Sequence, residues 1–166
     1  ISLSESQLLG DHDGTGQYIG LGEIHLNFDI DEQKVTNYVR YLDLNESISY
    51  VKFEYNQAQI TREYFVSYPD NALVIHINSS QGSIPDFTVS FDANCKSTKT
   101  VISKGNSIVF YGQLNDNEMI FSAKLLAMSK TAKIDSLESD KKLKISDATT
   151  DVYLYVTAAT DYKDVH

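Results

Sequence analysis

The feature that most constrains the fold is a series of short runs in which apolar and polar residues alternate. Residues 47–55 alternate almost strictly, and Ala58–Ser67 repeats the pattern after Asn56-Gln57. Alternation with a period of two is typical of strands that bury one face. Two such runs joined by two residues predict a β-hairpin.

Similar runs of β-branched and aromatic residues recur along the chain. Pro69-Asp70-Asn71 is a turn signal before a buried strand over 72–77, and Lys104-Gly105-Asn106 is a turn between two further runs. Roughly ten to twelve short strands spaced about 8–12 residues apart favour an all-β fold, a large antiparallel two-sheet super-sandwich, over alternating β and α units. The remaining predicted strands cover residues 87–91, 100–103, 107–113, 143–145 and 152–157.

Two segments depart from this pattern. Ser2-Leu3-Ser4-Glu5 forms a capping box, and Gly10 stands where a glycine would end a helix, so the sequence predicts a short N-terminal helix. Residues 118–128 fit the period of a strand and that of a helix equally well, and periodicity alone leaves their structure open.

Composition limits the class of protein. A chain of 166 residues with 42% hydrophobic residues can bury the core of one domain, and we expect residues 1–166 to form a single β-sandwich domain. The formal net charge of −9 disfavours nucleic acid as a partner, because binding to phosphates depends on Lys and Arg. Cys95 stands alone and allows no disulfide framework, and no apolar run is long enough for a membrane helix.

The histidines give no sign of a catalytic, metal or cofactor site. None of the four is spaced from another as on a metal-binding helix, and no nucleophile elbow or phosphate-binding loop precedes a helix. His76 lies in an apolar run and is expected to be structural, whereas His25 is expected on the outer face of a strand. We therefore expect no catalytic residue, metal or cofactor in this chain.

Acidic residues are concentrated near the start of the chain. A glycosidase pair of carboxyl groups, or a calcium site on Asp29, Asp31 and Glu32, is compatible with this concentration. Solvated acidic loops are the more common arrangement, and we favour that interpretation. The cluster consists of Asp11, Asp13, Glu23, Asp29, Asp31 and Glu32.

The segment with the most polar side chains and glycines is the loop over residues 10–18. Such loops on rigid scaffolds often bind ligands, although a surface connection packed against a neighbouring domain would look the same. The candidate binding residues of this loop are Asp11, His12, Asp13, Gln17 and Tyr18.

Four stretches together resemble a known family. Residues 8–28 contain LLG, DGxGxY and LGEIxLxF, residues 35–44 read VTNYVRYLDL, residues 60–70 read ITREYFVSYPD, and residues 154–162 match a closing strand. In this order they resemble the N-terminal β domain of glycoside hydrolase family 95, which contains α-L-fucosidases and some α-L-galactosidases. The chain departs from the family at Gln17-Tyr18, where members more often have Tyr-Gln, and it lacks the family's opening strands.

The resemblance implies a β-sandwich that packs on an (α/α)₆ catalytic barrel of the same parent chain. The parent would hydrolyse terminal α-1,2-linked fucose with inversion, using a glutamic acid and an Asn/Asp pair on the barrel, so a fucosylated glycan is a partner only through the parent. The isolated chain is expected to be inactive, and its loop over residues 11–18 would shape the substrate entrance. The resemblance also favours a strand over 118–128.

Other expectations concern single residues and rival functions. Arg40, Asp43, Arg62 and Glu63 are expected to form cross-strand charge pairs and turn contacts.

Two rival functions remain. An independent carbohydrate-binding module, which needs an exposed aromatic platform, is one alternative function, and a surface adhesin or spacer domain is another. A broad apolar patch would favour docking to a barrel over both. Localisation stays open, with a secreted or cell-surface bacterial parent as one outcome.

Overall fold

The computed structural model describes residues 20–92, 97–115 and 118–162. Apart from two short 3₁₀ helices, η1 (Glu32–Lys34) and η2 (Glu138–Asp140), the regular structure of these residues is entirely β. The strands are β1 (Glu23–Phe28), β2 (Thr36–Asp43), β3 (Ile48–Tyr55), β4 (Ala58–Ser67), β5 (Ala72–Ser79), β6 (Phe87–Asp92), β7 (Ser97–Lys104), β8 (Ser107–Leu114), β9 (Ile120–Ser129), β10 (Lys133–Leu137), β11 (Lys142–Ser146) and β12 (Val152–Thr160).

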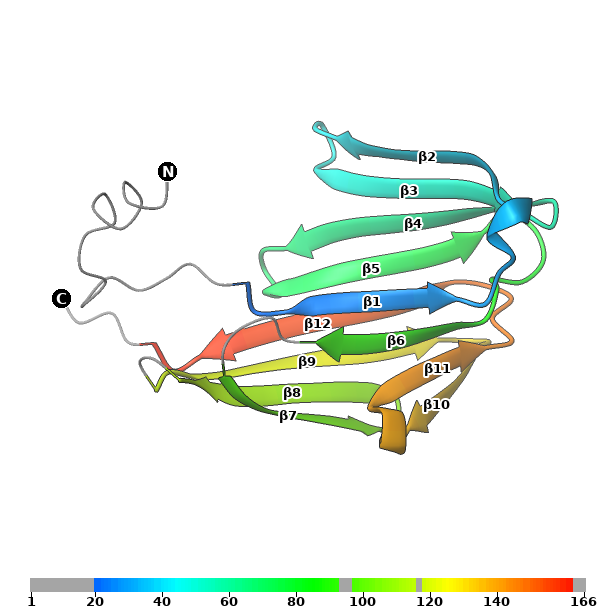
Figure 1. Ribbon diagram of the computed structural model, residues 1–166. Coiled ribbons are helices and arrows are strands. Elements are labelled where there is room, and N and C mark those ends of the chain that lie inside the picture. The colour runs from blue at the N-terminus through cyan, green and yellow to red at the C-terminus, as the bar shows by residue number, and fades with distance from the viewer. Residues whose placement is uncertain (1–19, 93–96, 116–117, 163–166) are drawn as a thin grey trace, which may run out of the picture.

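The strands form two antiparallel sheets, as Figure 1 shows. The larger sheet has eight strands in the order β2-β3-β4-β5-β12-β9-β8-β7, and the smaller has four in the order β1-β6-β11-β10. The predicted all-β antiparallel sandwich is therefore confirmed. The predicted N-terminal helix over residues 2–10 lies outside the described residues and stays a prediction.

The small sheet covers only part of the large one. In Figure 1 it lies in front of β12, β9, β8 and β7, while β2, β3 and β4 extend beyond its edge. Phe91 of β6 meets Phe110 of β8 with ring centroids 5.0 Å apart, and Phe28 of β1 meets Phe53 of β3 at 6.3 Å. These aromatic contacts join the two sheets.

The core lies between the sheets and follows the alternation of the strands. In β9, buried Phe121, Ala123, Leu125 and Ala127 alternate with less buried neighbours, so residues 120–129 form a strand and not a helix. These residues belong to one buried cluster to which both sheets contribute, with Phe87 and Phe110 among its largest members. A chain of this size can bury such a core without disulfides.

The predicted hairpins are confirmed at their turns. Asn56 and Gln57, between β3 and β4, both have positive φ values, of 49° and 68°. Positive φ at both central residues is the geometry of a type I′ turn, whose twist matches that of the flanking strands. Gly105, with φ of 59°, lies in the turn between β7 and β8.

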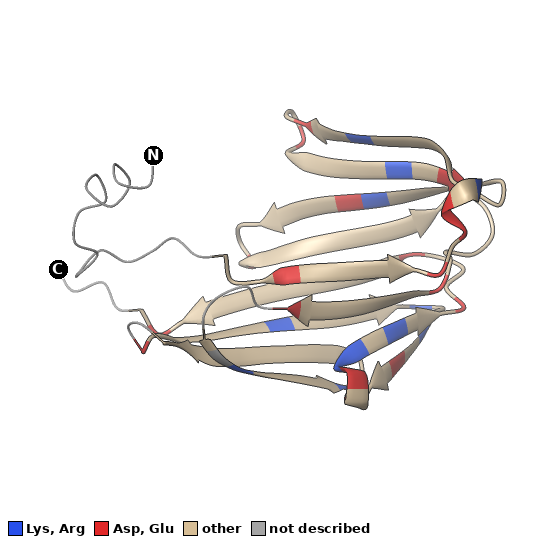
Figure 2. Ribbon diagram, viewed as in Figure 1, with Lys and Arg blue, Asp and Glu red and all other residues tan. Residues whose placement is uncertain are grey.

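Charged side chains are spread over the strands and the connections. Figure 2 shows Lys and Arg on several strands, including β2, β3, β4 and β11, and many Asp and Glu residues near the ends of strands. Among the described residues there is no helix with the length and apolar character needed to cross a membrane.

Candidate functional site

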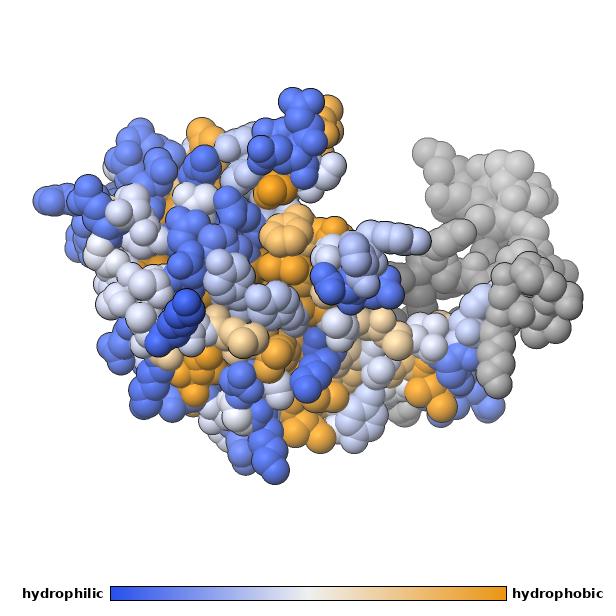
Figure 3. Space-filling view, turned by 180° about the vertical axis from the view of Figure 1, so that it is seen from behind, coloured by the Kyte–Doolittle hydropathy of each residue, from blue (hydrophilic) through white to orange (hydrophobic). Residues whose placement is uncertain are grey.

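The outer face of the large sheet, opposite the small sheet, carries a row of aromatic and polar side chains. Figure 3 looks onto the molecule from this side and shows hydrophobic residues in its middle, among hydrophilic ones. Side chains at paired positions of neighbouring antiparallel strands lie close enough to interact. From β2 to β9, the paired residues of this row are Tyr41, Tyr50, Glu63, His76, Tyr153 and Met128.

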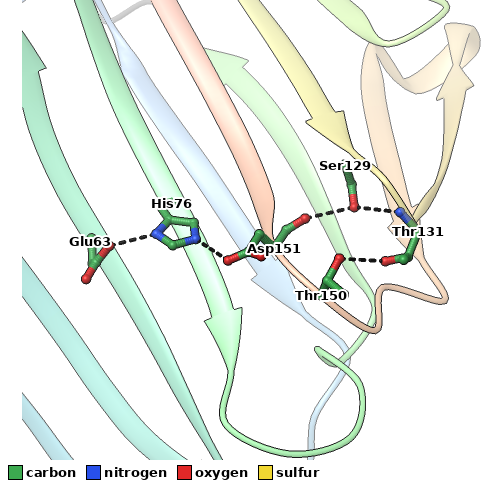
Figure 4. Close-up of polar contacts among 6 residues, drawn as sticks. All are labelled: Glu63, His76, Ser129, Thr131, Thr150 and Asp151. Atoms are coloured by element: carbon green, nitrogen blue, oxygen red, sulfur yellow. Dashed lines mark hydrogen bonds and ion pairs between the residues drawn. The ribbon is translucent and has the colours of Figure 1, made fainter.

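The centre of the row is a hydrogen-bonded group of one histidine and two carboxylates (Figure 4). His76 Nδ1 lies 2.7 Å from Glu63 Oε2, and His76 Nε2 lies 2.6 Å from Asp151 Oδ1. Each ring nitrogen therefore has a carboxylate oxygen within hydrogen-bond distance. The His76 side chain is 16% exposed, compared with 49% for Asp151.

Tyrosine rings continue this group along β12. The Tyr153 ring stacks on His76 with centroids 4.4 Å apart and planes 4° apart, and Tyr155 follows at 6.2 Å and 13°. Burial raises the pKa of the Tyr153 phenol above its usual value of 10.0, and the negative charge of Asp151 raises it further. The three rings therefore stand in nearly one orientation beside an acidic group.

Hydrogen bonds join the connection before β10 to the connection before β12. Ser129 Oγ donates to the Asp151 carbonyl oxygen at 2.8 Å and accepts from the backbone N–H groups of Thr131 and Ala132 at 3.3 and 3.1 Å. The hydroxyls of Thr131 and Thr150 lie 3.1 Å apart. Two segments that are distant in sequence are thus held side by side.

A groove of about 490 Å³ opens where these connections meet β9 and β12. This volume lies in the range of about 300–1,000 Å³ typical of small-molecule sites. Aromatic rings, hydroxyls, an ammonium group and a carboxylate line this groove together, a combination that suits a ligand with both apolar and hydroxylated surfaces. Its lining residues are Met128, Ser129, Lys130, Thr131, Thr150, Asp151, Tyr153 and Tyr155.

This arrangement is better suited to binding than to hydrolysis. A glycosidase places an acid and a base, or an acid and a nucleophile, on either side of the scissile bond. Here Glu63 and Asp151 both bond to the single imidazole of His76. In the described ranges, no group of three His, Cys, Asp or Glu residues is placed to hold a metal ion.

The predicted binding loop lies outside the described residues. Its candidate residues are Asp11, His12, Asp13, Gln17 and Tyr18. That loop therefore stays a prediction.

The expectations for two histidines are confirmed. His25 is on the exposed side of β1, and His76 is bonded within the sheet.

Asp31, from the acidic cluster, has contacts that the sequence did not predict. It caps η1 by accepting from the Gln33 backbone N–H, and it also pairs with Lys34 at 3.4 Å.

The predicted charge pairs and turn contacts are confirmed for Glu63 and for Asp43, which accepts from two backbone N–H groups in the turn after β2. For Arg62, the described residues provide no carboxylate partner, so the predicted pair is wrong within this part of the chain. Its guanidinium lies over the rings of Phe28 and Phe53, at 5.3 and 5.9 Å, a cation–π arrangement. Aromatic rings from β1 and β3 take the place of the expected carboxylate, a neighbourhood that exists only when the sheets pack together.

Sequence reasoning also missed Asp151 and the tyrosines of the groove. Asp151 is 75 residues from His76 in the sequence, and the two meet only because β12 pairs with β5. The one available signal was the polar segment Thr149-Thr150-Asp151 directly before an aromatic strand, and it does not indicate which residue Asp151 would contact.

Comparison with known proteins places the whole chain in one family context. The family described as "Glycosyl hydrolase family 65, N-terminal domain" matches residues 2–165. "Probable alpha-fucosidase A" of Aspergillus niger is 32% identical over 162 residues, which is 95% of this chain and 20% of that protein. "Alpha-L-fucosidase 2" of Arabidopsis thaliana is 31% identical over 94 residues, 55% of this chain and 11% of that protein.

A solved structure shares the fold. "Putative kojibiose phosphorylase from human microbiome" superposes with a TM-score of 0.59 and 16% sequence identity, over 86% of this chain and 23% of that chain. The chain spans about a fifth of the length of the Aspergillus niger relative. The family model and the two α-fucosidase relatives confirm the resemblance to the N-terminal β domain of α-fucosidases.

Proposed function

Because the chain belongs to the family of N-terminal domains of glycosyl hydrolase family 65, we propose that it is the non-catalytic β-sandwich domain of an α-L-fucosidase-like glycoside hydrolase. The observation that carries the proposal is the similarity to a probable α-fucosidase along 95% of this chain but only 20% of the relative. We take residues 1–166 as a single domain of such a longer protein.

The parent is proposed to hydrolyse terminal α-1,2-linked fucose with inversion. Inversion needs one carboxylic acid to protonate the leaving group and a base to activate water on the opposite side. In the described residues, the carboxylates Glu63 and Asp151 both bond to His76. This sharing argues against their acting as the acid and the base of an inverting hydrolysis. The catalytic groups are accordingly assigned to an (α/α)₆ barrel that forms the rest of the parent.

The domain's role in the parent is then architectural. Its sandwich would pack on the barrel, and the loop with Asp11, His12, Asp13, Gln17 and Tyr18 would shape the substrate entrance. Fold alone does not confer activity, so this division of roles must be tested on both parts.

The test compares the complete gene product that carries these 166 residues with the 166-residue chain alone, each incubated with 2′-fucosyllactose. We expect the complete protein to release fucose, with the β anomer first in proton NMR spectra, because inversion converts an α linkage into a β product. The chain alone should release none.

Each alternative outcome is informative. Fucose release by the chain alone would contradict the assignment of catalysis to another domain. A complete protein that releases no fucose would contradict the fucosidase assignment and leave an independent binding module or a spacer domain as the function. Initial release of the α anomer would contradict inversion only.

A further inference from the structure

We propose that the groove lined by Tyr153 and Tyr155 binds a neutral pyranose unit of an oligosaccharide. The inference depends on the proposed function only in the choice of glycan used as the probe. The groove itself is defined by the side chains of β9 and β12 and of the two connections beside them.

The aromatic wall suits the apolar face of a sugar ring. The C–H groups on one face of a pyranose pack well against an aromatic π-face, which carries partial negative charge. The rings of His76, Tyr153 and Tyr155 are within 4° and 13° of parallel from one to the next. Because stacking already limits their motion, a ligand would lose little side-chain entropy by packing on them.

The polar rim suits sugar hydroxyls. Asp151 uses one carboxylate oxygen for His76, and its side chain is 49% exposed, so it has acceptor capacity for a ligand O–H. The exposed hydroxyls of Thr131 and Thr150 can donate or accept. Lys130 offsets the charge of Asp151 within the same groove, which favours a neutral ligand over an ionic one.

The rim is also preorganised. Ser129 bonds to the backbone of both connections, and the Thr131–Thr150 contact joins them a second time. Glu63 holds His76, which in turn holds Asp151 (Figure 4). Positions fixed before binding reduce the free-energy cost of association, as a site for a weakly bound sugar requires.

The experiment is an NMR titration of the isotope-labelled 166-residue chain with 2′-fucosyllactose and with lactose. We expect shifts of the backbone amides of residues 128–131 and 150–155, with a Kd on the order of 1 to 10 mM for at least one of the two sugars. No shift with either sugar, or shifts only outside these segments, would overturn the proposal.

Matched variants test the assignment of the groove. Tyr155→Ala should weaken binding about tenfold and Thr150→Val about threefold, with the spectrum of the folded chain retained. Tyr111→Ala is the control, because Tyr111 is a 45% exposed tyrosine of β8 outside the groove, and it should bind as the wild type does. Equal loss in Tyr111→Ala, or no loss in both groove variants, would overturn the assignment.

Failure of this inference and failure of the proposed function are distinguishable. Hydrolysis of 2′-fucosyllactose by the complete protein, without binding by the 166-residue chain, contradicts the groove alone. Binding by the chain, without hydrolysis by the complete protein, contradicts the fucosidase assignment alone.

Discussion

Strands β9 and β2 of the eight-stranded sheet have different surroundings. In β9, under the four-stranded sheet, buried and less buried residues alternate, whereas in β2 seven of the eight residues are exposed. Yet β2 also carries large apolar side chains, such as Leu42, which is 60% exposed. Large apolar side chains in a strand therefore do not by themselves make it part of the core, because a second layer decides whether they are buried.

The difference determines where substitutions should have large effects. Removal of apolar atoms costs free energy when it leaves a cavity among packed neighbours and little when the side chain already contacts water. The covered half of the sheet (β12, β9, β8 and β7) and the edge half (β2, β3 and β4) should respond differently to the same type of change at exposed positions of the edge half. Phe53 and Ile60 of the edge half belong to the buried core and lie outside this contrast.

The largest expected effect contrasts the two halves directly. Phe110→Ala, in the covered half, should lower the free energy of unfolding by about 3–5 kcal/mol, because Phe110 is 1% exposed and packs on Phe91 and Phe121. Leu42→Ala, in the edge half, should change it by less than about 0.5 kcal/mol. Urea unfolding of both variants measures the difference. A comparable loss in Leu42→Ala would mean that the edge half is covered in solution.

The next largest effect concerns the junction of the halves, where His76 connects β4, β5 and β12. His76→Ala should cost about 1–3 kcal/mol of stability, because it removes the contacts of both ring nitrogens and leaves Glu63 and Asp151 without their shared partner. His25→Ala, on the exposed side of β1, is the control and should cost less than about 0.5 kcal/mol. Similar unfolding midpoints for the two variants would show that the His76 group contributes nothing to joining the halves.

A smaller pair of effects compares one turn from each half. Gln57→Gly, in the β3–β4 turn, should stabilise the protein by up to about 1 kcal/mol, because glycine adopts positive φ without strain. Gly105→Ala, in the β7–β8 turn, should destabilise it by about 1 kcal/mol. A Cβ at position 105 would meet nothing within 4 Å, so this loss reports backbone strain alone. Thermal unfolding of both variants tests the opposite signs.

The smallest effect is a loss of stability at alkaline pH. Burial and neighbouring acidic residues raise the pKa of Tyr50 in the edge half and of Tyr153 at the junction above 10.0. Above pH 10 the unfolded chain then loses these protons before the folded chain does, so stability should fall as pH rises through the folded-state pKa values. Tyr50→Phe and Tyr153→Phe should each reduce this loss of stability at alkaline pH. Neither should change the slope of stability against pH below pH 9. Stability curves from pH 8 to 12 measure it, and an unchanged alkaline slope in both variants would contradict the shifts.

Much of the architecture could be predicted from local sequence. The β3–β4 hairpin, the strand at 72–77 and the β7–β8 turn follow from alternation and turn chemistry, which act between neighbours in the chain. Strand β9 could not be predicted from periodicity alone, because its apolar residues fit both the period of a strand and that of a helix. Only the family resemblance favoured a strand there. The candidate groove was not predicted, because its wall and rim come from strands and connections that are adjacent only in the folded sheet.

Sequence by itself determined the β class and the main hairpins, because period-two patterning and turn residues act over a few positions. It also showed the similarity to fucosidase N-terminal domains, through four stretches in the same order. Tertiary structure alone decided that Arg62 lies on Phe28 and Phe53, that His76 lies between Glu63 and Asp151, and which half of the large sheet is covered. The physical reason is distance along the chain. Strand order and sheet packing bring distant residues together, and no local pattern encodes which of them will meet.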